Sequence, residues 1–531
     1  MQSSVSGTGD GGVPPGVPSV GHLLDEAPRS TFHRRTVLVS GVGFFTDAYD
    51  LFVIGTVSTI VATQWHLSTV ETSWVTGSAI LGAFFGALVF GRIADVLGRK
   101  SVYVGVSVIM VAGALASAVA PGFAWLVAAR FVLGLGIGGD YPVSAVLMSE
   151  YSNRHDRGRM VGMVFSMQAL GLIVGPLVGL LLLTSGISHE VAWRVMLGLG
   201  ALPAAAVVYL RSKMPESPRF TAQVQGRASQ AVSDLASYSD GVIGAPTGLT
   251  SAADRIGVGS FLRSRAMLIL ILGTAGSWFL FDYAYYGNTL SLPAILKEVD
   301  PSATLETKLL WTLGLFVVFA LPGYLLAVLT MDRIGHRRLQ SIGFAVMAAA
   351  FLVLAAFAHL TTLIGPFLAI FGLSYFFVQF GPNMTTFVLP SEVFPVSMRT
   401  TGHGIAAGIG KLGAFLGVFL VPQLQKHYGL RGMLAIAGVA AVLGWALTTV
   451  LPEPARRSLE SMQDGHDGGD GHDGRDGHDG PRITPPAVTP AQVTGTFDGS
   501  TAYPLVVPQD PESRTTPARR PASRTGLDRP R

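Results

Sequence analysis

The sequence predicts an all-α membrane protein with about twelve transmembrane helices in two six-helix, pseudo-symmetric halves. Three observations predict this fold class. The 531 residues are 49% hydrophobic and only 13% charged, whereas soluble domains contain about 25% charged residues. Apolar stretches of about 20 residues, enough to cross roughly 30 Å of hydrocarbon, recur along most of the chain. Short charged motifs that follow these stretches occur twice.

The apolar stretches fall into two sets of six. The first set lies at about 36–62, 73–95, 102–120, 123–146, 159–184 and 192–212. The second set lies at about 267–296, 309–331, 340–358, 363–389, 402–424 and 432–451. We therefore expect an N-terminal bundle over residues 36–212 and a C-terminal bundle over residues 266–452.

Polar segments flank and separate the two expected bundles. Residues 1–35 are rich in Gly, Ser and Pro, and no part of them resembles the core of a signal peptide. Residues 453–531 include a His/Asp/Gly repeat at 464–480, which we interpret as a solvated tail in preference to a metal site. We expect both terminal segments to be disordered, and the linker 213–265 to contain little ordered structure.

Basic residues predict the orientation. They follow the second and fourth apolar stretches and fill the linker, whereas the joints near 63–72 and 121–123 contain no Lys or Arg. Positively charged loops stay on the cytoplasmic side. We therefore expect a multi-pass protein of the cell membrane with both termini in the cytoplasm. The polar segment from about Arg211 to Arg265 adds seven basic residues, and its position between the two sets of six indicates a cytoplasmic linker.

The charged motifs support a division into two related halves. Gly91–Lys100 is echoed by Asp332–Arg338, and the pair Glu150/Arg157 is echoed by Glu392/Arg399 with the same spacing. The offset is about 240 residues, as expected for two repeats that rock around a central site. We interpret these helix-end charges as paired residues of a gate that closes the cytoplasmic side: Asp95, Arg99, Glu150, Arg157, Asp332, Glu392 and Arg399.

Several charged residues lie inside the apolar stretches, and those we single out are Asp47, Asp50, Asp140, Asp282 and Lys411. Each costs about 2.5 to 3.5 kcal/mol at the centre of a membrane helix, so its presence needs a reason. One such acid could be structural, but four together indicate proton movement. A central lysine beside them indicates a site for an anion.

Uncharged side chains accompany these charges. Trp278, Asp282 and Tyr286 recur at intervals of four residues and therefore share one helix face. The two aromatic residues could also be ordinary packing residues. Gln168 is the weakest candidate, because membrane helices use amides as interhelical contacts.

These motifs resemble those of the major facilitator superfamily and, within it, the phosphate:proton symporter family. The superfamily motifs are Gly91–Lys100, the duplicated Glu/Arg pairs and Pro215–Arg219. The family motifs are Gly43–Asp50, Gly136–Pro142 with Met148–Glu150, Trp278–Asp282, Pro382–Phe387 and Gly410–Ala414. The resemblance covers about residues 35 to 455.

The resemblance implies a role for each candidate residue. The phosphate site would be lined by Tyr141, Gln168, Trp278, Asp282, Tyr286, Asn383 and Lys411. The proton route would contain Asp47, Asp50 and Asp140, and Asp282 would couple it to the substrate. We therefore expect a proton-coupled importer of inorganic phosphate that works by alternating access.

Other functions remain open at this point. The superfamily motifs equally fit a proton symporter of a sugar or an organic acid, and a nutrient sensor with a transport fold is a third alternative. We expect no enzyme, because no catalytic constellation is present, and the absence of cysteine excludes thiolate chemistry. We expect partners to be phosphate, protons and the lipid bilayer, with no cofactor, metal or nucleic acid, and a monomer is compatible with the sequence.

Overall fold

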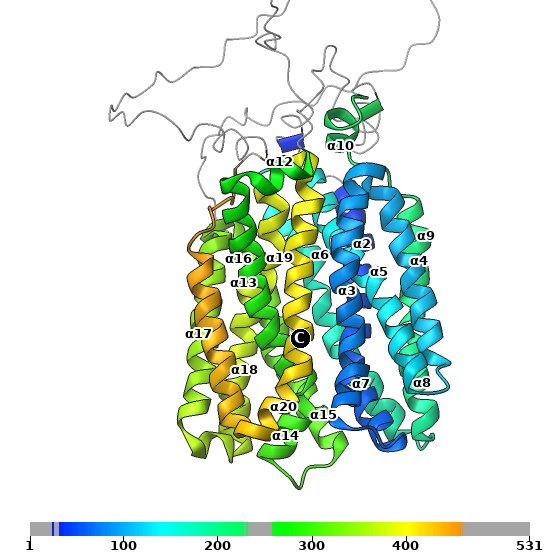
Figure 1. Cartoon of the computed structure of the whole chain (residues 1–531), viewed down its shortest axis with the longest axis vertical. Helices are drawn as coiled ribbons and strands as arrows, with labels where there is room; N and C mark the ends of the chain where they lie inside the picture. Colours follow the sequence, from blue (N-terminus) through cyan, green and yellow to red (C-terminus); the bar gives the residue numbers. More distant parts are fainter. Residues whose placement is uncertain (1–23, 26–30, 228–229, 232–256, 458, 460–531) are drawn as a thin grey trace, which may run out of the picture. The chain divides into compact units, whose positions relative to one another are not determined.

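The computed structural model describes residues 24–25, 31–227, 230–231, 257–457 and 459, and the described residues form helices and no strand (Figure 1). The His/Asp/Gly repeat at 464–480, most of the N-terminal segment and the middle of the linker lie outside the described residues. The expected all-α fold is confirmed.

The first half contains six membrane-spanning segments, two of which are interrupted. The fifth breaks at Met167 between α6 and α7, and the sixth breaks at Gly200 between α8 and α9. The helices are α2 (Thr31–Gln64), α3 (Thr69–Leu97), α4 (Arg99–Ala118), α5 (Phe123–Tyr151), α6 (Arg157–Ser166), α7 (Gln168–Thr184), α8 (His189–Leu199) and α9 (Ala201–Ser212).

The second half repeats this plan. Its helices are α13 (Arg265–Leu290), α14 (Leu292–Val299), α15 (Leu305–Leu315), α16 (Leu321–Ile334), α17 (His336–Ala356), α18 (Ile364–Phe380), α19 (Pro382–Val393) and α20 (Arg399–Thr448). Eleven described segments are long and apolar enough to cross a membrane. The last of them contains two helices that meet at Gly429, where φ is 68°, so the expected number of twelve agrees with the structure.

The linker differs from its expectation at both ends. Its beginning forms α10 (Pro218–Gln223), and its end forms α12 (Val258–Arg263). The Ser217 side chain accepts a hydrogen bond from Phe220 N, and a proline follows at the first helical position, which is a strong helix start. The prediction of little ordered structure is therefore wrong for these two ends.

The structure extends the internal repeat seen in the sequence. Gly98 and Gly335 each follow a helix with a φ near 100°, at 103° and 98°, and glycine adopts this conformation without strain. The carboxylate of Glu216 accepts hydrogen bonds from Arg99 N and Lys100 N at 3.1 and 3.2 Å. Glu453 accepts from His336 N and Arg337 N at 2.9 and 3.0 Å. Each half thus caps its third membrane helix with an acid from the segment after its sixth.

Helices α3 and α5 approach each other closely through glycines. A Cβ atom at Gly134 of α5 would overlap the carbonyl oxygen of Ala79, and one at Gly82 of α3 would overlap that of Phe131. Membrane helices use small residues in this way, because close packing replaces the hydrophobic drive that water would supply.

We predict that Gly134→Ala destabilises the protein by about 1 to 3 kcal/mol, since the added methyl group forces the two backbones apart. Thermal unfolding in detergent measures the change. The matched control is Gly105→Ala in α4, where a Cβ atom would meet nothing within 4 Å. Equal unfolding midpoints for the two variants would contradict the contact.

Candidate functional site

Lys411 and Asp282 form an ion pair at the interface of helices α20 and α13. The Nζ atom of Lys411 lies 3.1 Å from Asp282 Oδ2 and donates to the hydroxyl of Tyr286, also at 3.1 Å. Lys411 is 2% exposed and Asp282 1%. Asp282 and Tyr286 are four residues apart on α13, so they share a face. The expected approach of the lysine to the intramembrane acid is therefore present.

The lysine also contacts the first half of the molecule. Its Nζ atom lies 4.5 Å from the ring centroid of Tyr141, on α5, and 4.4 Å from that of Tyr286. Cation–π contacts with two rings stabilise an ammonium group that burial has desolvated. An ammonium has three N–H donors, and Asp282 and Tyr286 use two of them. The third can bind an oxygen of an anion.

A chain of polar side chains extends from Tyr141 across both halves. Gln168 Nε2 donates to the hydroxyl of Tyr141 at 2.7 Å, and Tyr324 donates to Gln168 Oε1 at 3.3 Å. Asn383 Nδ2 donates to Tyr324 at 2.7 Å and to Gln379. The structure therefore brings the expected Tyr141, Gln168 and Asn383 into one network.

Sequence reasoning missed two members of this network. Tyr324 on α16 links Gln168 to Asn383, and Gln379 on α18 donates to Tyr285 at 3.0 Å. Gln379 could have been identified from the sequence, because its amide lies four residues, about one helical turn, before Asn383. Tyr324 gives no comparable signal, because a single tyrosine in an apolar helix is ordinary.

Aromatic rings enclose the site on both sides along α2. Phe44 packs edge-to-face on Tyr141 at 5.1 Å, and Phe52 stacks on Tyr286 at 5.5 Å. Trp278 lies 6.3 Å from Tyr141 and contacts Gly410, whose missing side chain admits the indole. Phe44 and Phe52 are eight residues apart, or about 12 Å along the helix, so one helix covers the site from two directions.

A second buried ion pair joins Asp140 to Arg211. Arg211 Nη1 lies 2.5 Å from Asp140 Oδ1, and Nη2 donates to Oδ2 at 2.9 Å. The guanidinium also lies over the ring of Tyr103 at 3.7 Å. The interpretation of Arg211 as a linker residue is wrong, because the side chain lies fully buried inside the first bundle. It lies at the end of the sixth membrane segment, where Asp140, the ring of Tyr103 and the Ser107 hydroxyl compensate for the burial of its charge.

Asp47 lies near this pair, and Asp50 lies near Arg130. Asp47 interacts electrostatically with Asp140 and Arg211, and Asp50 with Arg130. Arg130 donates to the backbone oxygen of Asp50 at 2.7 Å. Neither carboxylate accepts a hydrogen bond within the described part of the chain. A buried carboxylate without a donor is costly when ionised, which suits a group that accepts protons.

The charged helix ends join the two halves at the end of the bundle where α10 and α12 lie, uppermost in Figure 1. Arg99 lies 3.1 Å from Asp95 and 3.2 Å from Glu150, and Arg399 of the second half lies 3.8 Å from Glu150. Asp95 also accepts from the amide and hydroxyl of Thr401, both at 2.6 Å. We call Asp95, Arg99, Glu150 and Arg399 the latch, and this end the latch end.

The expected partners within the duplicated motifs are partly wrong. Asp95 binds Arg99 as expected, but Glu150 binds Arg99 and Arg399 in place of Arg157. Arg157 binds Asp25 at 2.6 Å.

The second copy of the motif differs in the same way. Glu392 lies 3.0 Å from His336, and Asp332 lies 3.4 Å from it. Asp332 also accepts from Arg159 N of the first half at 2.9 Å. Spacing along one chain could not reveal these partners, because they come from elements distant in sequence.

Comparisons with known proteins place the chain among transporters. Residues 36–465 match the family model described as sugar (and other) transporter. Low affinity inorganic phosphate transporter 4 of Petunia hybrida is 34% identical, and the match covers 84% of this chain and 94% of the relative. Inorganic phosphate transporter 1-6 of Oryza sativa subsp. japonica is 35% identical, over 83% and 94%. The repressible high-affinity phosphate permease of Neurospora crassa is 32% identical, over 84% and 88%.

Solved structures share the fold. The proton:xylose symporter XylE of the major facilitator superfamily, bound to 6-bromo-6-deoxy-D-glucose, has a TM-score of 0.69 and 21% identity, covering 82% of this chain and 99% of that one. Its partially occluded inward open conformation, from E. coli, has a TM-score of 0.64 and 20% identity, covering 80% and 99%. At this level of identity the likeness shows the fold alone.

We predict that Arg211→Met lowers the free energy of unfolding by about 3 to 5 kcal/mol, because it leaves the Asp140 carboxylate buried without its partner. The double variant Asp140→Asn/Arg211→Met should recover part of the loss, since it buries no charge. Denaturant unfolding in detergent measures both. Arg338→Met, at an exposed position, is the control, and a loss no larger than in this control would contradict a stabilising role for the pair.

Proposed function

This chain belongs to the major facilitator superfamily, in the branch that contains the inorganic phosphate transporters, and on this premise we propose that it imports inorganic phosphate together with protons. The observation that carries the proposal is the Lys411 ammonium group, which lies 3.1 Å from both Asp282 and Tyr286 at the centre of the bundle. The names of the relatives supply the substrate, and the donors around Lys411 fit its chemistry.

Phosphate near neutral pH is an anion with oxygens in several directions. Lys411 offers a positive charge and one unused N–H. The hydroxyls of Tyr141 and Tyr286 and the amide groups of Gln168 and Asn383 offer further hydrogen bonds. Hydrogen bonds to a charged oxyanion are roughly twice as strong as neutral ones. Trp278, which interacts with Asp282, would line the site beside it.

Proton coupling follows from competition for the lysine. An ionised Asp282 already neutralises Lys411, so an incoming anion meets a neutral pair and an adjacent negative charge. Protonation of Asp282 removes that charge and frees the ammonium group for the anion. Proton and phosphate therefore bind with positive coupling, which is the thermodynamic content of symport.

The proton route would lie in the first half. Tyr141 follows Asp140 directly in the chain and interacts electrostatically with both Asp47 and Asp282. It therefore lies between the acid cluster and the substrate site. We propose that protons pass through Asp47, Asp50 and Asp140, with Arg211 held against Asp140 by an ion pair.

The membrane potential makes coupling necessary. An inside-negative potential opposes each entering negative charge by about 2.3 kcal/mol per 100 mV. If more than one proton enters with each phosphate monoanion, the net charge that moves is positive, and the membrane potential then favours uptake.

Alternating access would use the latch. We propose that the latch end faces the cytoplasm of a cell bounded by this membrane, with both chain termini on that side. A salt bridge between Glu150 and Arg399 and a hydrogen bond from Thr401 to Asp95 join the halves at that end. Release of phosphate inside the cell would require the Glu150–Arg399 and Asp95–Thr401 contacts to break as the halves rock.

We predict that proteoliposomes containing this protein take up labelled phosphate faster when the outside is more acidic, and that Asp282→Asn abolishes this stimulation. Exchange of external for internal phosphate should persist in the variant, because exchange moves no net proton. Asp300→Asn, at a surface loop, is the control. Wild-type uptake that ignores an imposed proton gradient would contradict symport, and competition by unlabelled sugars or organic acids would contradict the choice of substrate.

We predict that Tyr286→Phe raises the KM for phosphate by roughly 10- to 150-fold, since a hydrogen bond to a charged group contributes about 1.5 to 3 kcal/mol. Tyr283→Phe on the same helix is the matched control, because the Tyr283 hydroxyl is outside the network around Lys411. Initial uptake rates at several phosphate concentrations measure both. Equal KM values in the two variants would place the phosphate elsewhere.

A further inference from the structure

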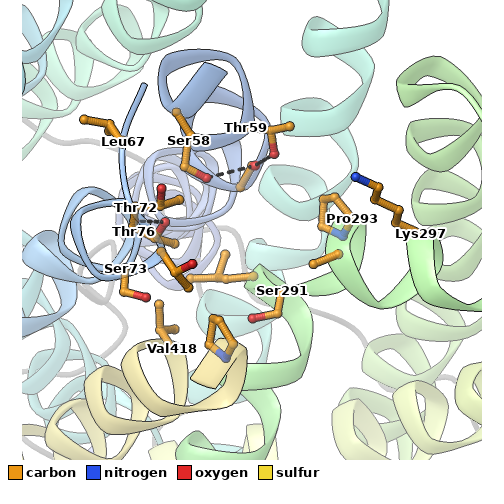
Figure 2. Close-up of a pocket in the computed structure, with 16 residues that line it drawn as sticks. Ser58, Thr59, Leu67, Thr72, Ser73, Thr76, Ser291, Pro293, Lys297 and Val418 are labelled. Atoms are coloured by element: carbon orange, nitrogen blue, oxygen red, sulfur yellow. Dashed lines mark hydrogen bonds between the residues drawn. The ribbon is translucent and has the colours of Figure 1, made fainter. Parts of the chain in front are cut away.

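A cavity of about 470 Å³ lies between the two halves, at the end opposite the latch. Figure 2 shows that helices from both halves form its wall: α2 and α3 on one side, and α13, α14 and α20 on the other. Its polar lining consists of hydroxyl groups, those of Ser58, Thr59, Thr72, Ser73, Thr76 and Ser291 among them. At roughly 30 Å³ per water, the cavity holds about fifteen waters, which is enough for a partly hydrated small ion.

Within the part of the chain that the structure describes, the lining of this cavity contains a positive charge and no negative one. Lys297 of α14 is its one charged residue, and it has no ion-pair partner among the described residues. In Figure 2 its amino group points toward the side formed by α2, where Ser58 and Thr59 lie. A single unpaired cation in a concave wall without acids attracts anions and repels cations.

The hydroxyls add hydrogen-bonding capacity. Ser73, a residue that is 3% exposed, lines the cavity, and its hydroxyl has no hydrogen-bond partner in the described structure. A buried hydroxyl normally finds a partner, so this one fits a ligand that enters the cavity. Ser58 and Thr59 donate to the carbonyl of Gly55, and rotation can turn such hydroxyls toward an oxyanion.

The cavity lies in line with the central site. Leu290, in its lining, is four residues beyond Tyr286 on α13, or about 6 Å along the helix. Val418, also in the lining, is seven residues beyond Lys411 on α20, or about 10 Å. The ring of Phe52 stacks on Tyr286, and Gly55, three residues later, lines the cavity. A solute leaving the cavity therefore meets Phe52 and then the Lys411 pair.

We propose that this cavity is an anion-capture site, in which Lys297 and the surrounding hydroxyls bind a small oxyanion before it passes Phe52. The inference rests on the proposed function for the identity of that anion, inorganic phosphate. Because the wall comes from both halves, their closure at this end would shrink the cavity and move the anion inward.

Transport kinetics test the capture site. Lys297→Gln should raise the KM for phosphate about three- to fivefold at low salt and leave the maximal rate unchanged, because capture affects encounter and not translocation. Lys297→Glu should raise it further, and added salt should reduce the difference. Lys426→Gln, an exposed lysine outside the lining, is the matched control. Lys297 variants with the KM of this control would overturn the proposal.

Labelling tests the same cavity without transport. The chain contains no cysteine, so Thr72→Cys introduces a single thiol into the cavity wall of the full-length protein. An anionic thiol reagent should label it faster than a cationic reagent of similar size, Lys297→Glu should reverse that preference, and inorganic phosphate should slow the labelling. Thr63→Cys, exposed and outside the lining, should show none of these effects.

The two experiments separate the two proposals. Wild-type protein that moves no phosphate but keeps the anionic labelling preference would refute the proposed substrate and support the anion site. Wild-type protein that moves phosphate but shows no labelling preference and no effect of Lys297 would refute the anion site alone.

Discussion

The cost of placing charge in a low-dielectric interior determines how this bundle is organised. Several buried ion pairs join different helices at positions where an unpaired charge would be too costly. They are Lys411 with Asp282, Arg211 with Asp140, and Arg99 with Asp95 and Glu150. Breaking a buried pair costs several kcal/mol, so these contacts fix the mutual positions of their helices. Because a buried charge needs a partner, these ion pairs are also sensitive to ligands. A proton or an anion that binds nearby changes which partner each charge prefers.

Some of these ion pairs lie within one half of the molecule and others join the two halves. We infer their roles from this difference. The Asp140–Arg211 pair lies entirely within the first half, so it can persist while the halves move. The Glu150–Arg399 contact spans the halves, and in the proposed mechanism it breaks when the latch end opens. Lys411 belongs to the second half but lies over Tyr141 of the first. A ligand bound at Lys411, as we propose, would therefore contact both halves.

Much of the fold and of the central site could be predicted from the sequence, for a physical reason. Hydrophobic length and the rarity of intramembrane charge are local properties, so they indicated the twelve helices, Asp282 and Lys411 directly. Arg211 was misplaced because a basic residue at a helix end is usually at the membrane surface, and only Asp140, distant in sequence, shows that it is buried. Residue spacing likewise could not reveal the partners of Glu150 and Arg157 or the role of Tyr324, because these depend on contacts between residues that are distant in sequence.

The paired acids Glu216 and Glu453 have a consequence for the ancestry of the chain. The same number of residues separates Glu216 from Gly98 as separates Glu453 from Gly335, and each acid caps the corresponding helix of its own half. A gene segment that ended at its sixth membrane helix would have left this cap behind. A single copied unit that already included the short stretch after that helix would account for both caps.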